Sequence, residues 1–279
     1  MKLKFNSAQK NVKAIKKTFL IAGKLRKPLK IDLQVQDKDT NYFFTPKCKT
    51  ELFRYLTFFT KEEGTLEWLR NTITDGDVFV DIGANIGIYS LYAAKLNKNI
   101  KVFSFEPHKP NFITLIQNVV DNQLQDVISP IALALSDSSD IIKLNYPSLV
   151  SGSSGSQLGH KKAPGEDKEF KPEFEEIVPA MTLDELVERK VLPTPTVIKI
   201  DVDGNEIKII NGMAKVLTSA NKPKSIQVEL NVGEQTDIAA ALEKFGYKLQ
   251  NRHFTLNGKA ALERGEALEN IAHNAVFVA

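Results

Sequence analysis

Short apolar runs rich in β-forming residues alternate with helical stretches from residue 78 onward. The apolar runs are VFVDI (78–82), KVFSFE (101–106), VISPIALAL (127–135), TVIKID (196–201) and KSIQVEL (224–230). Segments with the apolar spacing of helices lie between most of them, at 87–96, 109–122, 182–190 and 205–219. This order predicts an α/β fold, with a mostly parallel sheet that is covered by helices on both faces.

The two ends of the chain depart from this alternation. A helix-like stretch at 236–245 is followed by YKLQ and NAVFVA, which can close a parallel sheet with an antiparallel C-terminal edge. Residues 30–59 contain short alternating and aromatic stretches instead. We therefore expect a main domain at 60–279, preceded at 1–59 by a basic helix and short accessory elements.

Residues 147–176 interrupt the main domain. They begin with the serine- and glycine-rich PSLVSGSSGSQLG and continue into a charged stretch without apolar periodicity. About 30 residues without regular structure in a compact domain are typical of a functional lid or of local disorder. We expect a flexible loop or lid, of which residues 151–157 could fold over a ligand and exclude water.

Charge is distributed unevenly along the chain. Residues 1–31 contain 10 Lys and Arg and no Asp or Glu, whereas the rest has 27 basic and 34 acidic residues. An apolar stripe recurs there at steps of three and four, which predicts an amphipathic helix through Val12, Ile15, Phe19 and Ala22. This helix either docks on the main domain or contacts an anionic membrane surface or nucleic acid. Docking is the commoner use of such a stripe, so a nucleic-acid partner is not expected.

The composition narrows the class of protein. With 42% hydrophobic and 25% charged residues, it matches ordinary soluble globular domains. Cys48 is the only cysteine, so neither an internal disulfide nor a cysteine-based zinc site can form. No apolar stretch approaches the roughly 20 residues that span a membrane. We expect a cytoplasmic protein.

The motif DIGANIG lies where the first predicted strand turns into a helix. In an open α/β sheet, ligands bind beyond the carboxyl ends of the strands, at loops of this kind. Gly83 permits a tight turn, and Gly87 permits close approach of the helix or of a ligand to the backbone. Asp81 ends the strand with a carboxylate that can bind an ammonium group but would repel a pyrophosphate.

Glu106 closes the second strand, 19 residues after Gly87. An acid at this place can accept hydrogen bonds from both hydroxyls of an adenosine ribose. The G-x-G-x-x-G spacing of NAD-binding loops is absent, since Gly83 and Gly87 are four apart with Asn85 between them. The pattern predicts a nucleoside cofactor other than NAD and disfavours a dehydrogenase.

A second group of acids follows the fourth strand, in IKIDVDGNEIKIINGM. Asp201, Asp203 and Glu206 lie where a strand ends and a helix begins, so they should face the same crevice. The run does not fit a calcium loop, because its glycine, Gly204, stands at the fourth position and the twelfth position is not glutamate. We expect no metal. Helix capping is an alternative to a role in the reaction, and the two are compatible.

Six motifs follow one another in a fixed order over about residues 60–230: DIGANIGIYSLYAA, FSFEPHKPNF, ALALSD, SGSSGSQL, MTLDEL and VIKIDVDGNEIKIINGM. In this ordered set the chain resembles the FkbM-type family of S-adenosylmethionine-dependent methyltransferases. The resemblance implies a Rossmann-like seven-stranded methyltransferase sheet with S-adenosylmethionine as cofactor. It also implies O-methylation of a hydroxyl on a sugar, glycan or secondary metabolite, so the partner would be a small-molecule or glycan acceptor.

By position, the resemblance also implies cofactor-binding residues. The methionine portion would be lined by Asp81, Gly83, Asn85 and Gly87. The ribose would be held by Glu106.

Further cofactor contacts follow from the same resemblance. Asp137, after ALALS, would lie near the adenine. Glu63 resembles an acid often found before the first strand, although Glu62 could equally be that residue. The chain departs from the family at Asp203, where glutamate is usual, and the shorter side chain reduces the reach of the carboxylate by about 1.5 Å.

Methyl transfer to a hydroxyl calls for a general base, or for a metal that lowers the pKa of the hydroxyl, because a sugar hydroxyl is a poor nucleophile at neutral pH. Three carboxylates are the first candidates, since each falls at or just after the carboxyl end of a strand: Asp201, Glu206 and Glu229. Further candidates are the imidazoles of His108, His160 and His253. The alternative is a non-catalytic S-adenosylmethionine-binding or scaffold protein, which would need no acid near the methyl group.

Overall fold

The computed structural model describes residues 2–6, 32–162, 168–233 and 235–279. The amphipathic helix expected at residues 12–22 lies outside these ranges. Strand β1 (Lys2–Asn6) is the described part of the basic arm, and it pairs in parallel with β2 (Asp32–Asp37). None of the helices in the described ranges is long and apolar enough to cross a bilayer.

A seven-stranded sheet forms the centre of the main domain. Its spatial order is β13-β14-β12-β11-β4-β5-β6, in which only β14 runs antiparallel to its neighbours. The strands are β4 (Val78–Ile82), β5 (Lys101–Phe105), β6 (Ile128–Ile131), β11 (Val197–Ile200), β12 (Ser225–Leu230), β13 (Lys248–His253) and β14 (His273–Val278). The predicted parallel sheet with an antiparallel C-terminal edge is confirmed.

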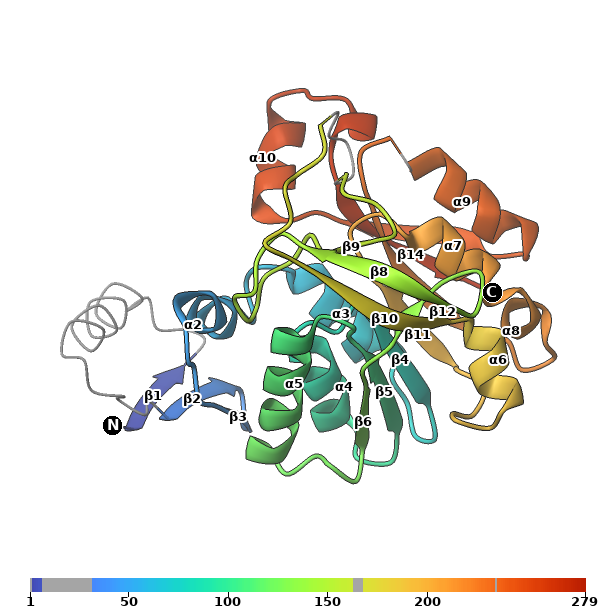
Figure 1. The fold of residues 1–279 in the computed structure, drawn as a ribbon. Helices are drawn as coiled ribbons and strands as arrows, with labels where there is room; N and C mark the ends of the chain where they lie inside the picture. Colours follow the sequence, from blue (N-terminus) through green and yellow to red (C-terminus); the bar gives the residue numbers. More distant parts are fainter. Residues whose placement is uncertain (1, 7–31, 163–167, 234) are drawn as a thin grey trace.

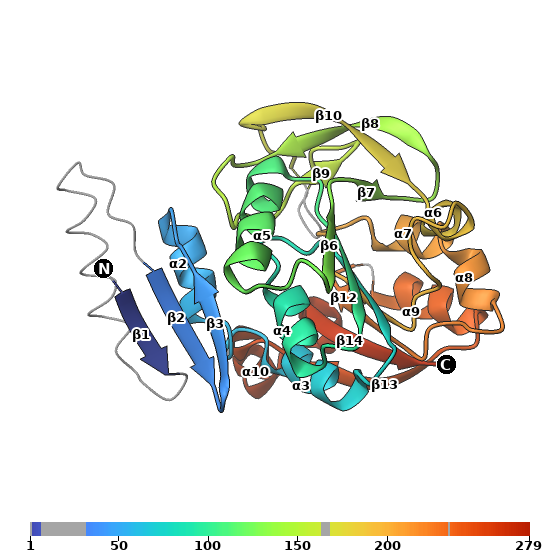
Figure 2. The ribbon, with the colours of Figure 1, turned by 90° about the horizontal axis from the view of Figure 1, so that it is seen from below.

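Helices cover both faces of this sheet (Figures 1 and 2). One face carries α3 (Glu63–Thr72), α4 (Ile88–Leu96) and α5 (Lys109–Asp121). The other carries α6 (Leu183–Glu188), α7 (Glu206–Asn211), α8 (Ala214–Thr218) and α9 (Gln235–Lys244). Strand residues alternate between the two resulting cores, so that Phe79 packs in the first, and Val80 and Ile82 in the second. The tail adds α10 (Leu256–Glu263) and a short 3₁₀ turn (Leu268–Asn270).

The helix expected at 205–219 is broken in two. Gly212 ends α7 and lies so close to the preceding loop that a Cβ atom there would be 2.0 Å from the carbonyl oxygen of Ser136. The chain turns at this contact before α8 begins.

A second, four-stranded sheet crosses the carboxyl end of the first (Figures 1 and 2). Its order is β7-β10-β8-β9, from β7 (Ala134–Leu135), β8 (Asp140–Tyr146), β9 (Gln157–Leu158) and β10 (Phe174–Met181). The run expected as one strand at 127–135 is therefore divided between two sheets. The interruption expected at 147–176 contains β9 and the start of β10, and its described part also includes a bridge between Lys162 and Glu169.

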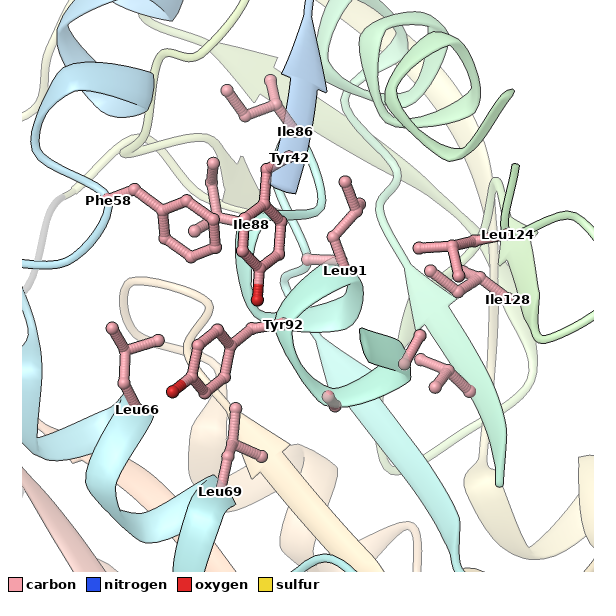
Figure 3. Close-up of a cluster of buried hydrophobic side chains, with 14 of the residues drawn as sticks. Tyr42, Phe58, Leu66, Leu69, Ile86, Ile88, Leu91, Tyr92, Leu124 and Ile128 are labelled. Carbon is pink, nitrogen blue, oxygen red and sulfur yellow. The ribbon is translucent and has the colours of Figure 1, made fainter. Parts of the chain in front are cut away.

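The accessory elements pack on the α4 side of the domain. Strand β3 (Thr40–Phe44) and helix α2 (Lys49–Leu56) precede the main domain. The ring of Tyr42 meets Phe58 edge-on at 4.8 Å between centroids and stacks on Tyr92 of α4 at 6.3 Å. Figure 3 shows these rings together with Leu66 and Leu69 of α3. This packing carries α2 to the carboxyl end of the central sheet, where it contributes to the site.

Candidate active site

A cavity opens where the strand order of the central sheet reverses, beyond the carboxyl ends of β4 and β11. Its volume is about 240 Å³. In open α/β sheets this switch point is where ligands bind. The lining comes from the loops after β4, β5 and β11, from Lys199 and Glu229 within β11 and β12, from the region of α2 and α3, and from the serine-rich segment after β8.

The loop after β4 forms the floor of the cavity and depends on its glycines. Gly83 has φ of 75°, and a Cβ atom there would lie 1.9 Å from the carbonyl oxygen of Asp201. Asn85 also adopts a left-handed φ, of 52°, which asparagine tolerates better than most residues. Gly87, in contrast, packs α4 against α5, because a Cβ atom there would lie 2.3 Å from Leu115. Gly83 and Asn85 line the cavity, and Gly87 supports it from behind.

Glu106 projects into the cavity from the end of β5. Its two carboxylate oxygens accept hydrogen bonds from the backbone N–H groups of Asn85, at 2.7 Å, and His108, at 2.9 Å. Burial raises the pKa of Glu106 to about 7, although these hydrogen bonds act in the opposite direction. A carboxylate oxygen has more than one lone pair, so Glu106 can still accept hydroxyl groups from a ligand.

A smaller apolar cavity adjoins the main one. It has a volume of about 50 Å³ and shares Gly83, Pro107, Leu144, Ser156 and Val202 with the lining of the larger cavity. The rest of its wall is mainly apolar and includes Phe105, Leu133, Leu135, Leu158 and Ile209. A flat, apolar ring system such as a purine base suits this wall.

Acids gather at the opposite end of the main cavity. Asp201 follows β11, and the carboxyl group of Glu229 in β12 hydrogen-bonds to it. The Asp201 charge, together with burial, raises the pKa of Glu229 to about 10. Burial also opposes ionisation of Asp201, but Lys199 and Lys61 hold the pKa of Asp201 below its ordinary value. At neutral pH the pair therefore consists of an ionised Asp201 and a protonated Glu229.

The serine-rich segment covers the cavity through a set of hydrogen bonds. The carbonyl of Ser153 accepts from Nδ2 of Asn85, at 2.8 Å, and from Nδ2 of Asn111, at 3.0 Å. The N–H of Gly155 donates to Oδ2 of Asp203, at 2.7 Å. Nε of Arg54 in α2 donates to the carbonyl of Gly152. The segment is thus tied to the floor of the cavity, to α5, to the loop after β11 and to α2.

The residues expected from the sequence divide into two groups. The cavity is lined by Gly83, Asn85, Glu106, Asp201 and Glu229. The others lie outside its lining and are Glu63, Asp81, Gly87, Asp137 and Glu206.

Each side chain outside the lining has a structural reason for its place. Asp81 is fully buried beneath the loop and accepts a 2.6 Å hydrogen bond from Ser90. Glu206 accepts from the N–H of Gly204, at 2.9 Å, in the loop before α7. Asp137 is exposed and accepts hydrogen bonds from neighbouring serines. Glu63 is exposed, and the adjacent Glu62 lines the cavity instead.

Sequence reasoning missed several lining residues, of which Lys199 is the most informative. Lys199 stands in the middle of the apolar strand VIKI and is buried, with its Nζ atom 2.8 Å from Oδ2 of Asp201. A lysine in an otherwise buried strand needs a buried partner, and that signal could have been read from the sequence. Arg54 and Tyr89 carried no such signal. Of the candidate histidines, His108 lines the cavity, whereas His160 and His253 do not.

The described residues contain no group of three or more His, Cys, Asp and Glu side chains arranged to hold a metal ion.

The order and direction of the strands, with the single reversed strand β14 between β13 and β12, define a Rossmann-like methyltransferase fold. Proteins with this fold use S-adenosylmethionine, and the cavity lies where an open α/β sheet binds its ligand. The chain belongs to the FkbM methyltransferase family, since the family model described as the methyltransferase FkbM domain matches residues 81–249. Recognition of the family from its motifs is confirmed.

Two curated relatives are methyltransferases. The hexuronic acid methyltransferase AglP of Haloferax volcanii is 29% identical over 68% of this chain and 70% of its own length. The methyltransferase sdnD of Sordaria araneosa is 24% identical over 61% of this chain and 73% of its own length.

Similar solved structures are more distant. Aeropyrum pernix fibrillarin with bound S-adenosylmethionine has a TM-score of 0.46 at 9% identity, over 89% of this chain and 82% of that one. A putative tRNA (m1A22) methyltransferase of Streptococcus pneumoniae, also with S-adenosylmethionine, has a TM-score of 0.44 at 11% identity, over 77% and 72%. Likeness at this level assigns no function.

The cavity residues fit the family's cofactor, S-adenosylmethionine, part by part. Glu106 would hold the ribose hydroxyls, and the apolar extension would hold the adenine. Oε2 of Glu62 is buried, and the hydroxyl of Tyr89 lies beside this carboxylate, which raises the pKa of Tyr89 through its charge and a hydrogen bond. An ammonium group such as that of the methionine portion would pair with this buried carboxylate.

Proposed function

We propose that this protein transfers a methyl group from S-adenosylmethionine to a hydroxyl group of a sugar, glycan or secondary metabolite. The observation that carries the proposal is the pair formed by Asp201 and Glu229 in the wall of the cofactor cavity. Both curated relatives are methyltransferases, and one of them is named for a sugar acid. A largely polar cavity wall suits an acceptor rich in hydroxyl groups.

Asp201 is the proton acceptor in this proposal. When bound, S-adenosylmethionine supplies an electrophilic methyl group on its sulfonium. An attacking hydroxyl becomes more acidic as its oxygen forms the new bond, so an ionised carboxylate within hydrogen-bond reach can take its proton. Glu229 already holds a proton at neutral pH and cannot serve as that base. Its hydrogen bond instead orients the Asp201 carboxylate.

Alignment and exclusion of water fall to other residues. Positioning of the two reactants can supply much of the rate enhancement of a displacement reaction. The serine-rich segment shields the cavity through its bonds to Asn85, Asn111 and Asp203. Arg54 and Lys61 bring positive charge to the cavity wall, and would contact the part of the acceptor beyond the reacting hydroxyl.

The test is transfer of tritium from methyl-labelled S-adenosylmethionine to fractionated cell glycans and small molecules. Asp201→Asn should reduce transfer about 100-fold, with cofactor affinity retained in calorimetry. Glu229→Gln should lose much less, because an amide can still donate to Asp201. A larger loss in Glu229→Gln than in Asp201→Asn would contradict these assignments.

The labelled product identifies the acceptor atom. A methyl ether on a hydroxyl resists mild alkali, whereas a methyl ester on a sugar acid is hydrolysed. If mild alkali releases the label, the acceptor is not a hydroxyl and this part of the proposal is wrong. If wild-type protein binds S-adenosylmethionine but labels no fraction, the non-catalytic cofactor-binding alternative is correct. If it does not bind the cofactor, the interpretation of the cavity is wrong.

A further inference from the structure

Lys199 lies in a row of polar side chains that crosses the central sheet under α3 and α4. In the strand register, Lys199 of β11 is flanked by Asp81 of β4 and Gln227 of β12. Next to Asp81 in the same row comes Ser104 of β5. Register neighbours in a sheet point to the same face, so these side chains form one buried layer, from which Lys199 also reaches the cavity lining.

The ammonium of Lys199 is shared between two carboxylates. Its Nζ atom lies 2.8 Å from Oδ2 of Asp201 and 3.9 Å from Oδ1 of Asp81, and the side chain is 1% exposed. It also lies 5.0 Å from the centre of the Tyr89 ring. Asp81 is held from its other side by Ser90, and its Oδ1 has no hydrogen-bond partner among the described residues. Oδ1 of Asp81 is therefore bound to Lys199 by charge alone.

Two carboxylates around one buried amino group require that Lys199 be charged. Burial alone would lower the pKa of Lys199, but the charges of Asp201 and Asp81 raise it above its ordinary value. A buried ion that loses its partner is strongly destabilised, so each member of the group depends on the others. Of the three, Asp81 is fully buried and does not line the cavity, whereas Asp201 and Lys199 do.

We propose that Lys199 is a positioning residue for methyl transfer: anchored from below by Asp81, it fixes Asp201 as the ionised member of the Asp201–Glu229 pair and so selects Asp201 to receive the acceptor's proton. This proposal rests on the proposed function. The proposal assigns Asp81, the acid of DIGANIG, a role other than contact with the cofactor. Asp81 acts on the reaction through the lysine of the neighbouring strand.

Other charged groups face this pair and do not change the selection. Glu62, before α3, and Asp203, in the loop after β11, both add negative charge near Glu229 and favour its protonated form. Lys61 adds positive charge near Asp201. Lys199 is the cation in hydrogen-bond contact with Asp201, and it is held on the Asp201 side of the pair.

The test is a pH titration of the Asp and Glu side-chain carboxyl carbons by NMR, in the full-length protein without acceptor. Wild type should show Asp201 titrating below its ordinary range. In Lys199→Met the Asp201 midpoint should rise by about one pH unit or more. An isosteric double variant, Asp81→Asn with Lys199→Met, removes both buried charges and should show the same rise. An unchanged Asp201 midpoint in either variant would overturn the proposal.

A second measurement needs no variant and therefore does not depend on their folding. The Nζ signal of Lys199 in ¹⁵N-labelled wild-type protein should be that of a charged ammonium, protected from exchange, from pH 6 to pH 9. A neutral amine at pH 7 would overturn the proposal.

The activity readout separates a positioning role from a structural one. The probe is the rate of tritium transfer to the most active glycan or small-molecule fraction, measured as a function of pH. In the double variant the acidic limb of this profile should shift to higher pH, by the amount that NMR gives for the Asp201 midpoint. A lower rate with an unmoved profile would overturn the role of Lys199. Wild-type protein that labels no fraction would instead overturn the proposed function, and the titration would still report on the lysine.

Discussion

Oδ2 of Asp203 accepts a 2.7 Å hydrogen bond from the backbone N–H of Gly155 and thereby joins the loop after β11 to the serine-rich segment after β8. The backbone carbonyl of Asp203 accepts a second bond, of 2.6 Å, from Nε2 of Gln157. Asp203 adopts a left-handed φ of 60°, a conformation that Asp tolerates better than most side chains. The shorter acid that stands here in place of the family's usual glutamate fits this tight contact.

Asp203→Ala should release the cover of the cavity. The Gly155 amide would lose its acceptor, so hydrogen exchange at residues 153–157 should accelerate about tenfold. This factor corresponds to the loss of one hydrogen bond that stabilises the segment by about 1.4 kcal/mol. Asp203→Asn is the matched control, because its side-chain carbonyl can still accept from Gly155. Exchange at Gly155 that is equally slow in the alanine variant would show that the contact does not hold the segment.

Gly83 should tolerate no side chain. Gly83→Ala would place a Cβ atom 1.9 Å from the carbonyl oxygen of Asp201, in addition to the strain of a φ of 75°. We expect a loss of about 3 kcal/mol or more in the free energy of unfolding, measured with denaturant. Gly76→Ala is the control, since Gly76 has a φ of 80° and nothing within 4 Å of the added atom. It should cost only the backbone strain, about 1 kcal/mol. Equal losses in the two variants would mean that the contact with Asp201 relaxes freely.

Cofactor affinity should depend on the protonation of Glu106. Burial raises its pKa to about 7, so the carboxyl gains a proton as the pH falls from 8 to 6. A neutral carboxyl accepts hydrogen bonds from ribose hydroxyls less strongly than a carboxylate does. Calorimetry should show affinity for S-adenosylmethionine falling about threefold to tenfold over that range. In Glu106→Gln the affinity should be lower at pH 8 and nearly independent of pH. A wild-type affinity that does not change between pH 6 and pH 8 would contradict this role.

The strands of the central sheet were predictable because they are short, apolar and buried on both faces, as in VFVDI and VIKID. The second sheet was not, since β8 and β10 mix charged residues with apolar ones that face solvent. Ile141 and Ile177 are 66% and 67% exposed. The pairing of β8 with β10 also joins segments that the serine-rich segment separates in the sequence, so no local sequence pattern predicts it.

The site was predictable where a backbone conformation demands a residue type, as at Gly83 and Asn85, or where an acid ends a strand, as at Glu106 and Asp201. Prediction failed where the direction of a side chain decides. Glu62 and Glu63 are neighbours at the start of α3, and only Glu62 lines the cavity. Glu206 turns back to the loop before α7 instead. Such directions depend on helix phase and packing, which spacing in the sequence does not fix.

Glu229→Gln should stabilise the protein, increasingly so at higher pH. In the folded protein the pKa of Glu229 is raised to about 10 from an ordinary value of 4.5, chiefly by Asp201 and secondly by burial. The unfolded chain therefore loses this proton at a lower pH than the folded protein does. The contribution of Glu229 to stability is complete below pH 4.5 and declines as the pH rises towards 10. At neutral pH Glu229 therefore lowers the free energy of unfolding, which is common for a residue that is retained for its role in the reaction.

Glutamine cannot ionise, so the variant avoids this loss while keeping an amide that can donate to Asp201. The difference in unfolding free energy between variant and wild type should grow with pH between 5 and 9. This difference can grow by at most about 1.4 kcal/mol per pH unit, and screening by solvent and relaxation of the Asp201–Glu229 pair reduce it. Denaturant unfolding at several pH values measures it. A pH-independent difference for Glu229→Gln would show that Glu229 is ionised in the folded protein, and the assignment of Asp201 as the base would fall with it.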